Sequence, residues 1–251
     1  AGKTKEAQYF YSLICPPMLR IFTLFLLAIA PLRNEQYALA PLVPATMELQ
    51  GIDVSHYQKV IDWDMVAEKQ ALDFAFVKAT EGHEYRDSLF CRNWDNLRRL
   101  GIRRGAYHFF RAYGCGDEQA RNFLTTVEME PGDIAPVLDL EVTDGIDPEV
   151  MVEEARIWLD IVESNLGIRP IIYTNQFFYE RYLAGRFEHY PLWIAHYTKA
   201  AQPDVPPPWT RALVWQYAAS APGFEGRVDG VPGLVDRNRL FGSLDDLRVQ
   251  R

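Results

Sequence analysis

The sequence predicts a (β/α) barrel of eight mainly parallel strands with about five helices. Short apolar runs alternate with capped helical segments from residue 51 onward, and β-α-β order implies parallel pairing through right-handed crossovers. The roughly 200 residues after position 50 lie at the lower size limit of such barrels. Helical patterns end near residue 185, which fits a barrel that lacks its last helices. A doubly wound sheet is the alternative, but no Gly-rich phosphate loop follows the first strand.

The first half of this region contains four predicted strands and three predicted helices. Asp62 is a suitable helix N-cap, Gly101 is a suitable helix end, and Pro131 with Gly132 stops the third helix. The strands cover residues 51–54, 74–79, 104–110 and 134–142, and the helices cover 62–71, 88–101 and 117–130.

The second half begins with the helix that has the clearest end signals. Asp147 is at its N-cap, Pro148 is in its first turn and Gly167 follows its end, which is the usual asymmetry of helix termini. A strand at 170–174 and a helix at 175–185 follow. The remaining strands, at 192–196, at 213–217 and near 234–236, are joined by loops rich in proline and glycine.

Residues 1–50 differ from the rest and are treated as an N-terminal extension to a barrel domain at 51–251. The apolar stretch 21–32 is too short to span a bilayer, which needs about 20 residues. It resembles the hydrophobic region of a signal peptide, and a retained hydrophobic anchor is the alternative. Both interpretations predict a secreted, periplasmic or envelope protein whose only membrane contact is through this segment.

Charge and cysteine content narrow the choice of partners. The formal net charge is −8 and there is no run of Lys or Arg, which argues against nucleic acid or an anionic membrane as the main partner. A neutral polymer fits better, and no protein partner is evident. The three cysteines have no metal-binding spacing. Cys91 and Cys115 would pair in an exported protein or stay as free thiols.

Two acidic residues interrupt the most apolar of the predicted strands. The run 134–142 reads IAPVLDLEV, with Asp139 and Glu141 two positions apart, so both carboxylates point to one face of the strand. Unpaired carboxylates in a core are costly, so this face is expected to open onto a polar cleft. Buried salt bridges are the alternative. Two acids against apolar walls are suited to general acid catalysis on an acetal bond.

Other candidate residues lie at the predicted strand ends, where β/α barrels have their reactive groups. Asp53 ends the first strand and Asp236 lies in the last. Aromatic faces stack on sugar rings, although each aromatic residue could equally be core. No His or Cys cluster has a metal-ligand spacing, so we expect no metal and no cofactor. The substrate-binding candidates are Tyr107, Phe109, Tyr173, Trp193, Trp215, Gln216 and Tyr217.

Several ordered motifs resemble family 25 glycoside hydrolases, the Chalaropsis-type lysozymes. The resemblance covers residues 51 to about 242, and residues 1–50 lie outside it. The motifs are GIDVSHYQ (51–58), IDW (61–63), FVKATEG (76–82), GAYHFF (105–110), DLE (139–141), IYT (172–174), LWIAHY (192–197), WQY (215–217) and VDRN (235–238).

The resemblance implies a flattened, irregular barrel that cleaves the β-1,4 bond between N-acetylmuramic acid and N-acetylglucosamine in peptidoglycan. It implies that Glu141 is the catalytic glutamate and Asp139 the neighbouring aspartate, that Asp53 and Asp236 are the first- and last-strand aspartates, and that Tyr173 contacts the N-acetyl group. From these residues we expect Glu141 to donate a proton while ionised Asp139 orients the acetamido group for attack on the anomeric carbon. Net retention is then expected; inversion through activated water is the alternative.

Three other functions remain as alternatives. A family 18 chitinase would carry a longer DGxDxDxE run, which is absent here because 134–137 contains no acid. A non-catalytic sugar-binding module needs the aromatic residues but not four clustered acids. A metal-dependent hydrolase would lose its activity in excess chelator.

Overall fold

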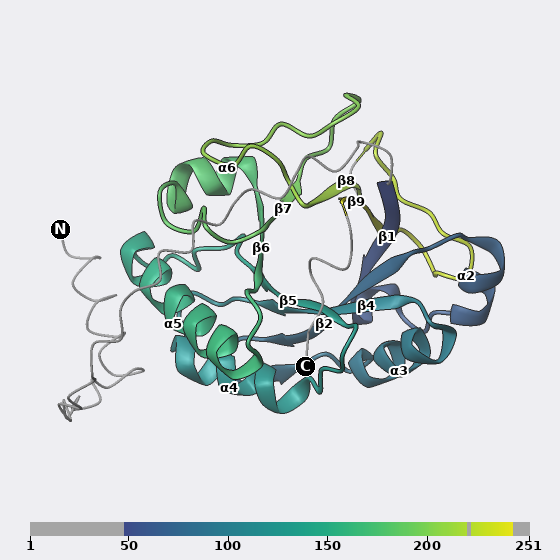
Figure 1. The fold of residues 1–251 in the computed structure, drawn as a ribbon, viewed down its shortest axis with the longest axis horizontal. Helices are drawn as coiled ribbons and strands as arrows, with labels where there is room; N and C mark the ends of the chain where they lie inside the picture. Colours follow the sequence, from purple (N-terminus) through teal and green to yellow (C-terminus); the bar gives the residue numbers. More distant parts are fainter. Residues whose placement is uncertain (1–47, 220–221, 243–251) are drawn as a thin grey trace, which may run out of the picture. The chain divides into compact units, whose positions relative to one another are not determined.

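The computed structural model describes residues 48–219 and 222–242, and this part of the chain folds as a closed barrel (Figure 1). The helices are α2 (Trp63–Lys69), α3 (Phe90–Leu100), α4 (Gly116–Thr126), α5 (Pro148–Leu166) and α6 (Gln176–Phe178), with a 3-10 turn at His56–Gln58 and a π turn at Tyr179–Leu183. The strands are β1 (Glu48–Val54), β2 (Phe74–Glu81), β3 (Tyr85–Arg86), β4 (Arg103–Phe109), β5 (Ile134–Asp139), β6 (Ile171–Asn175), β7 (Leu192–Ala195), β8 (Val214–Ala218) and β9 (Asp236–Phe241).

Strand pairing closes the barrel between β1 and β2. The order around it is β1-β9-β8-β7-β6-β5-β4-β2, and β1 pairs with β2 in parallel. Strand β9 is antiparallel to both β1 and β8, whereas the other barrel pairs are parallel. The predicted barrel of eight mainly parallel strands with about five helices is therefore confirmed. The two-residue strand β3, which forms a hairpin on β2, was not predicted.

Several element boundaries differ from those predicted. Strand β1 begins at Glu48, so three residues assigned to the N-terminal extension belong to the barrel. Strand β5 ends at Asp139, which leaves Glu141 just beyond it. The last strand covers Asp236–Phe241 instead of a stretch near 234–236. The predicted signal or anchor segment 21–32 lies outside the described residues. None of the described helices is long and apolar enough to cross a membrane.

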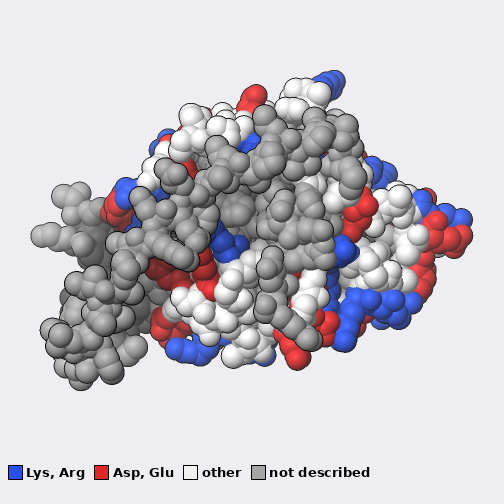
Figure 2. Space-filling model, viewed as in Figure 1, with Lys and Arg blue, Asp and Glu red and all other residues white. Residues whose placement is uncertain are grey.

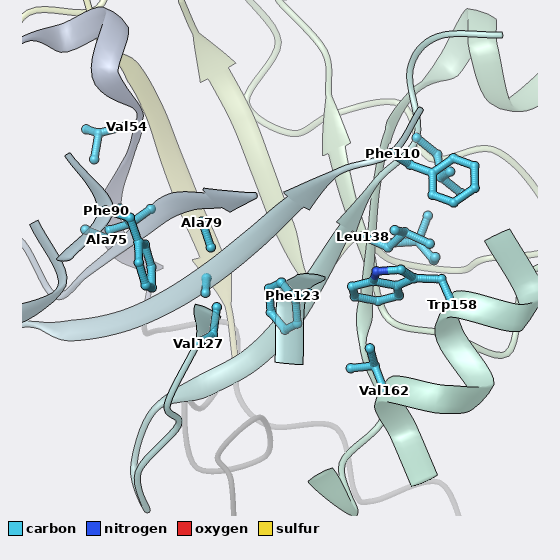
Figure 3. Close-up of a cluster of buried hydrophobic side chains, with 14 of the residues drawn as sticks. Val54, Ala75, Ala79, Phe90, Phe110, Phe123, Val127, Leu138, Trp158 and Val162 are labelled. Atoms are coloured by element: carbon cyan, nitrogen blue, oxygen red, sulfur yellow. The ribbon is translucent and has the colours of Figure 1, made fainter. Parts of the chain in front are cut away.

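The main core lies between the barrel wall and the helices packed on it. Trp158 and Val162 of α5 point toward Leu138 of β5 and toward Phe110, which follows β4 (Figure 3). All four side chains are at most 1% exposed. Helix α5 presents Trp158 and Val162 to the barrel wall because its apolar residues recur at helical spacing. This packing holds the end of β5, where Asp139 lies, against a rigid support.

A second apolar cluster fills the barrel interior near the beginnings of the parallel strands. Its members include Phe74 and Phe76 of β2, Ile134 of β5 and Trp193 of β7. The Phe76 and Trp193 rings are stacked, with centroids 4.4 Å apart. Because these side chains occupy the barrel interior near the strand beginnings, the space for a polar pocket is at the opposite, carboxyl-terminal ends of the parallel strands.

The surface of the barrel carries mixed charge. Figure 2 shows acidic and basic side chains interspersed on the viewed face. Arginines of α3 take part in ion pairs: Arg98 lies 3.0 Å from Glu130 and Arg99 lies 2.8 Å from Asp64. The sequence left open whether Cys91 pairs with Cys115; in the structure Cys91 is a free, exposed thiol, so that pair does not form.

Candidate active site

A pocket of about 320 Å³ opens where the barrel strands end. The antiparallel strand β9 begins at Asp236, and that beginning lies at the same end as the carboxyl termini of its parallel neighbours. All four predicted acids therefore reach one site. Of the eleven predicted site residues, nine line this pocket: Asp53, Asp139, Glu141, Asp236, Tyr107, Phe109, Tyr173, Trp193 and Gln216.

Trp215 and Tyr217 do not line the pocket, so their assignment to a sugar-binding cleft is corrected. Side chains alternate along a strand, and Gln216 between them points into the barrel. Trp215 instead packs on the outer face of β8 with Ile194, and its indole Nε1 donates to the carbonyl of His196 at 2.7 Å. The WQY motif thus supplies one pocket residue and two residues of the outer wall.

Asp53 is held by two amide donors inside the barrel. Gln216 Nε2 donates to Asp53 Oδ2 at 2.9 Å, and Asn238 Nδ2 donates to the same oxygen at 2.7 Å. Asn238 is oriented in turn by Trp193, whose Nε1 donates to its Oδ1 at 2.9 Å. Burial raises the pKa of Asp53, and the amide hydrogen bonds oppose that rise. The two amide donors hold the Asp53 carboxyl group in one position, where it can accept further hydrogen bonds.

Asp236 faces Asp53 across the β1–β9 ladder, where the two are register partners. Burial, then the negative charge of Asp53, raises the pKa of Asp236 to about 8. The two carboxyl groups share a side-chain hydrogen bond. At neutral pH Asp236 therefore holds a proton, which it donates to Asp53.

Asp139 and Glu141 form the second acidic pair. Asp139 is 7% exposed, and its Oδ1 has no hydrogen-bond partner among the described residues. Burial, then the charge of Glu141, raises the pKa of Asp139 well above its ordinary value. Burial, then the charge of Asp53, also raises the pKa of Glu141. The more deeply buried Asp139 thus retains a proton more strongly than Glu141 does.

Lys78 places a positive charge in the pocket wall. Its Nζ donates to Glu81 Oε2 at 2.6 Å and lies 4.6 Å from the centroid of the Phe109 ring. The side chain of Lys78 is 6% exposed. Its charge opposes the upward shift of the pKa of both Asp139 and Glu141. Glu81 also accepts from Arg111 at 3.3 Å, so the lysine belongs to a short chain of ion pairs.

The pocket residue Tyr173 and the nearby Tyr197 are both held by hydrogen bonds to Gln216. The Tyr173 hydroxyl donates to Gln216 Oε1 at 3.1 Å, and the Tyr197 hydroxyl donates to the same oxygen at 2.6 Å. Burial raises the pKa of Tyr107 and of Tyr173 well above the ordinary value. Both phenols therefore stay protonated and serve as neutral polar contacts beside the acids.

Five pocket residues were not predicted from the sequence. Lys78 could have been found by the reasoning applied to Asp139, because it interrupts a buried apolar strand. No comparable signal marks the others, which follow β1 or end it. The five are Lys78, Val54, Ser55, Tyr57 and Gln58. Within residues 48–219 and 222–242, no group of three or more His, Cys, Asp or Glu side chains could hold a metal ion.

Comparison with known proteins gives a consistent family. The sequence matches glycosyl hydrolases family 25 over residues 52–225. It is 39% identical over 211 residues to YegX of Escherichia coli K12, covering 82% of this chain and 75% of YegX. It is 35% identical over 214 residues to lysozyme M1 of Streptomyces globisporus, covering 79% of this chain and 69% of that protein.

A solved structure gives the same result at the level of the fold. The crystal structure of a bacterial lysozyme from Streptomyces coelicolor superposes with a TM-score of 0.71 at 33% identity, covering 80% of this chain and 96% of that one. The family match extends over more than half of the chain, from Ile52 in β1 to Glu225. The chain therefore belongs to glycosyl hydrolase family 25 and is a glycoside hydrolase.

Proposed function

We propose that this enzyme hydrolyses the β-1,4 bond between N-acetylmuramic acid and N-acetylglucosamine in peptidoglycan, with Glu141 as general acid and Asp139 orienting the substrate N-acetyl group. Membership of the family and the similarity to lysozyme M1 support peptidoglycan as the substrate. Such a substrate requires the barrel to act in the cell envelope or outside the cell. The observation that most supports the residue roles is the buried, unpartnered Oδ1 of Asp139 beside Glu141.

Substrate binding would change which acid of the pair holds the proton. A buried carboxyl oxygen without a donor is unfavourable, and the acetamido N–H of a bound sugar would supply the missing donor to Asp139. A hydrogen bond to the charged form of a carboxyl group favours ionisation. The proton of the pair would then reside on Glu141, which is the more exposed of the two and lies just beyond the strand end.

The reaction then follows from these positions. Glu141 donates its proton to the glycosidic oxygen as the C1–O bond breaks, and the acetamido carbonyl oxygen forms a bond to C1. The leaving sugar departs as an alcohol, and the resulting oxazolinium carries the positive charge next to ionised Asp139. Water then attacks C1, gives a proton to the Glu141 carboxylate and opens the ring, which regenerates the acetamido group with net retention.

The pair formed by Asp53 and Asp236 is suited to position that water. Ionised Asp53 can accept a hydrogen bond from it, and the two amides that fix Asp53 keep the acceptor in place. The charge of Asp53 also raises the pKa of Glu141, which helps the glutamate to remain an acid at neutral pH. Neither role requires a metal ion.

Digestion of purified peptidoglycan by the full chain tests this proposal. The new ends are reduced with borohydride, and the sugars are identified after acid hydrolysis. N-acetylmuramic acid should be found at the new reducing ends, and the Glu141→Gln protein should release almost none. New N-acetylglucosamine ends, or cleavage of chitin alone, would show that another bond is the substrate. Immediate release of the α-anomer would show inversion instead of retention.

A further inference from the structure

Three aromatic side chains gather on the rim of the pocket, next to the first two barrel strands. We call them the rim cluster: His56 and Tyr57, in the turn after β1, and Tyr85 of β3. The His56 and Tyr57 rings have centroids 4.2 Å apart, and the His56 and Tyr85 rings 6.0 Å apart. Tyr57 is 74% exposed and Tyr85 is 40% exposed. Exposed aromatic side chains gathered in one place are typical of surfaces that bind a ligand or partner.

A buried carboxylate fixes the rim cluster in place. Asp87 Oδ2 accepts from the backbone N–H of His56 at 2.9 Å and lies 2.8 Å from its ring Nδ1. The other oxygen accepts from the backbone N–H of Leu89 at 2.9 Å. The Tyr85 hydroxyl lies 3.1 Å from the same ring nitrogen of His56. Two loops from different strands are thus joined, and the exposed ring of Tyr57 rests on a preorganised base.

The rim cluster is continuous with the catalytic pocket. Tyr57 itself lines the pocket, together with Lys78 and Phe109. Lys78 Nζ lies 5.8 Å from the Tyr85 ring centroid and 4.6 Å from that of Phe109, so it connects the two aromatic groups. A row of aromatic and polar groups therefore runs from the acids to the exposed face of Tyr57.

We propose that the rim cluster is an additional sugar-binding subsite, which holds a further unit of the glycan strand outside the pocket. The proposal rests on the function proposed above, because it takes the N-acetyl sugars of the strand as its ligand. A cavity of about 320 Å³ is at the small end of ligand pockets, so a polymer must continue over its rim. The flat, exposed ring of Tyr57 offers the kind of surface on which a sugar ring stacks.

The length of the glycan strand provides the test. Tyr57→Ala in the full chain should raise KM for long peptidoglycan strands about three- to tenfold, with kcat changed less than twofold. KM for the shortest strand that the enzyme cleaves should rise less than KM for long strands, because such a strand meets only the part of Tyr57 that lines the pocket. Tyr57→Trp should keep wild-type KM for both lengths. Phe177→Ala removes an aromatic ring of similar exposure, 68%, that does not line the pocket, and should have no effect.

Binding without turnover separates this proposal from the proposed function. In the Glu141→Gln background, Tyr57→Ala should weaken binding of long strands by the same factor as it raises KM. Unchanged binding and unchanged KM would overturn the subsite even if the wild-type enzyme releases N-acetylmuramic acid ends. An equal loss for long and short strands, or an equal loss with Phe177→Ala, would overturn it as well. Wild-type cleavage at another bond, with binding to long strands that depends on Tyr57, would instead refute only the bond specificity.

Discussion

Among the described residues that line the pocket, Lys78 alone carries a positive charge, and it faces several carboxyl groups. The positive charge of Lys78 opposes the rise in the pKa of Asp139 and Glu141. Glu81 forms an ion pair with the Lys78 ammonium at 2.6 Å. Arg111 contacts the far oxygen of Glu81. The protonation of Asp139 and Glu141 therefore depends on how strongly Glu81 offsets the positive charge of Lys78.

Replacing Lys78 should displace the pH dependence of activity. The ammonium favours the ionised forms of Asp139 and Glu141, so its loss in Lys78→Met should raise the pKa of both. In the substrate complex, the acid limb of kcat requires ionised Asp139 and the alkaline limb requires protonated Glu141, so both limbs should move to higher pH. Glu81→Gln removes a negative charge that raises the pKa of Asp139 and should move the acid limb to lower pH.

Lys78→Arg is the matched control, because it retains the charge and should keep the profile near that of the wild type. The pH profiles of kcat at saturating soluble glycan provide the measurement. Profiles of unchanged position in both Lys78→Met and Glu81→Gln would mean that the lysine has only a packing role.

Asp139 and Glu141 could be predicted from the sequence because charged residues are unexpected inside an apolar strand. A carboxylate inside an apolar strand has an energetic cost that needs an explanation, and this reasoning placed Asp139 and Glu141 in a cleft. Asp53 and Asp236 came from their positions at strand ends. Tyr57 could not be predicted in this way, because an exposed tyrosine in a turn is ordinary until the structure shows its neighbours His56 and Tyr85.

Strand β8 shows what a pattern of elements can and cannot predict. The WQY motif correctly indicated a strand, but an aromatic-polar-aromatic triplet does not reveal which face is inside. Gln216 occupies the interior because it completes the network around Asp53, and alternation then places Trp215 outside. A predicted helix at 175–185 became the short helix α6 followed by a π turn, which local patterns do not distinguish.

Helices α4 and α5 meet at a backbone contact that has room only for glycine. A Cβ atom added to Gly116 would lie 2.0 Å from the carbonyl oxygen of Glu154, and the Gly116 N–H donates to Glu154 Oε2 at 2.5 Å. Substitution would thus force the two helices apart.

Gly116→Ala should lower the free energy of unfolding by about 1–3 kcal/mol, the usual cost of overpacking. Denaturant titration of the full chain provides the measurement. Arg121→Ala, on the exposed side of the same helix with 68% of its side chain accessible, should change stability by less than about 0.5 kcal/mol. Equal stability of Gly116→Ala and the wild type would show that the helices can separate without cost.

For the whole molecule, the shifted pKa values of buried groups make the free energy of unfolding depend on pH. The pKa of Asp236 is raised from 3.8 to about 8 in the folded barrel, so between these values the folded state binds a proton that the unfolded state does not. This contribution to stability is present below pH 4 and is lost as pH rises through 8. The pKa of buried His108 is lowered to about 3, so its contribution increases as pH rises from 3 to 6.5.

Asp236→Asn should therefore gain stability relative to the wild type as pH rises from 4 to 8, because asparagine resembles the protonated acid and does not titrate. The contribution of His108 is shared by both proteins and cancels in the difference. Melting temperatures across this range measure the effect, with the exposed residue Glu128→Gln as control. A difference that stays constant with pH would mean that Asp236 titrates normally in the folded protein.

The barrel as a whole was predictable because local and global signals agreed. Alternating strands and capped helices specified parallel pairing, and helices that end after β6 left β7, β8 and β9 to close the barrel. The antiparallel direction of β9 was not predictable, because the chain returns to β1 through a long loop without a regular pattern. That direction matters for the proposed site, since it places Asp236 opposite Asp53.

The central claim is that Glu141 is the proton donor and that Asp139 orients the acetamido group. The most direct test compares two rates for each variant. One is the rate on peptidoglycan, and the other is the rate on a substrate in which an activated aryl group replaces the leaving sugar. Glu141→Gln should lose about 10²- to 10⁴-fold on peptidoglycan and recover most of the loss on the aryl substrate, which needs little protonation. Asp139→Asn should be slow on both substrates. Near wild-type activity of Glu141→Gln on peptidoglycan, or recovery by Asp139→Asn instead, would contradict the assignment.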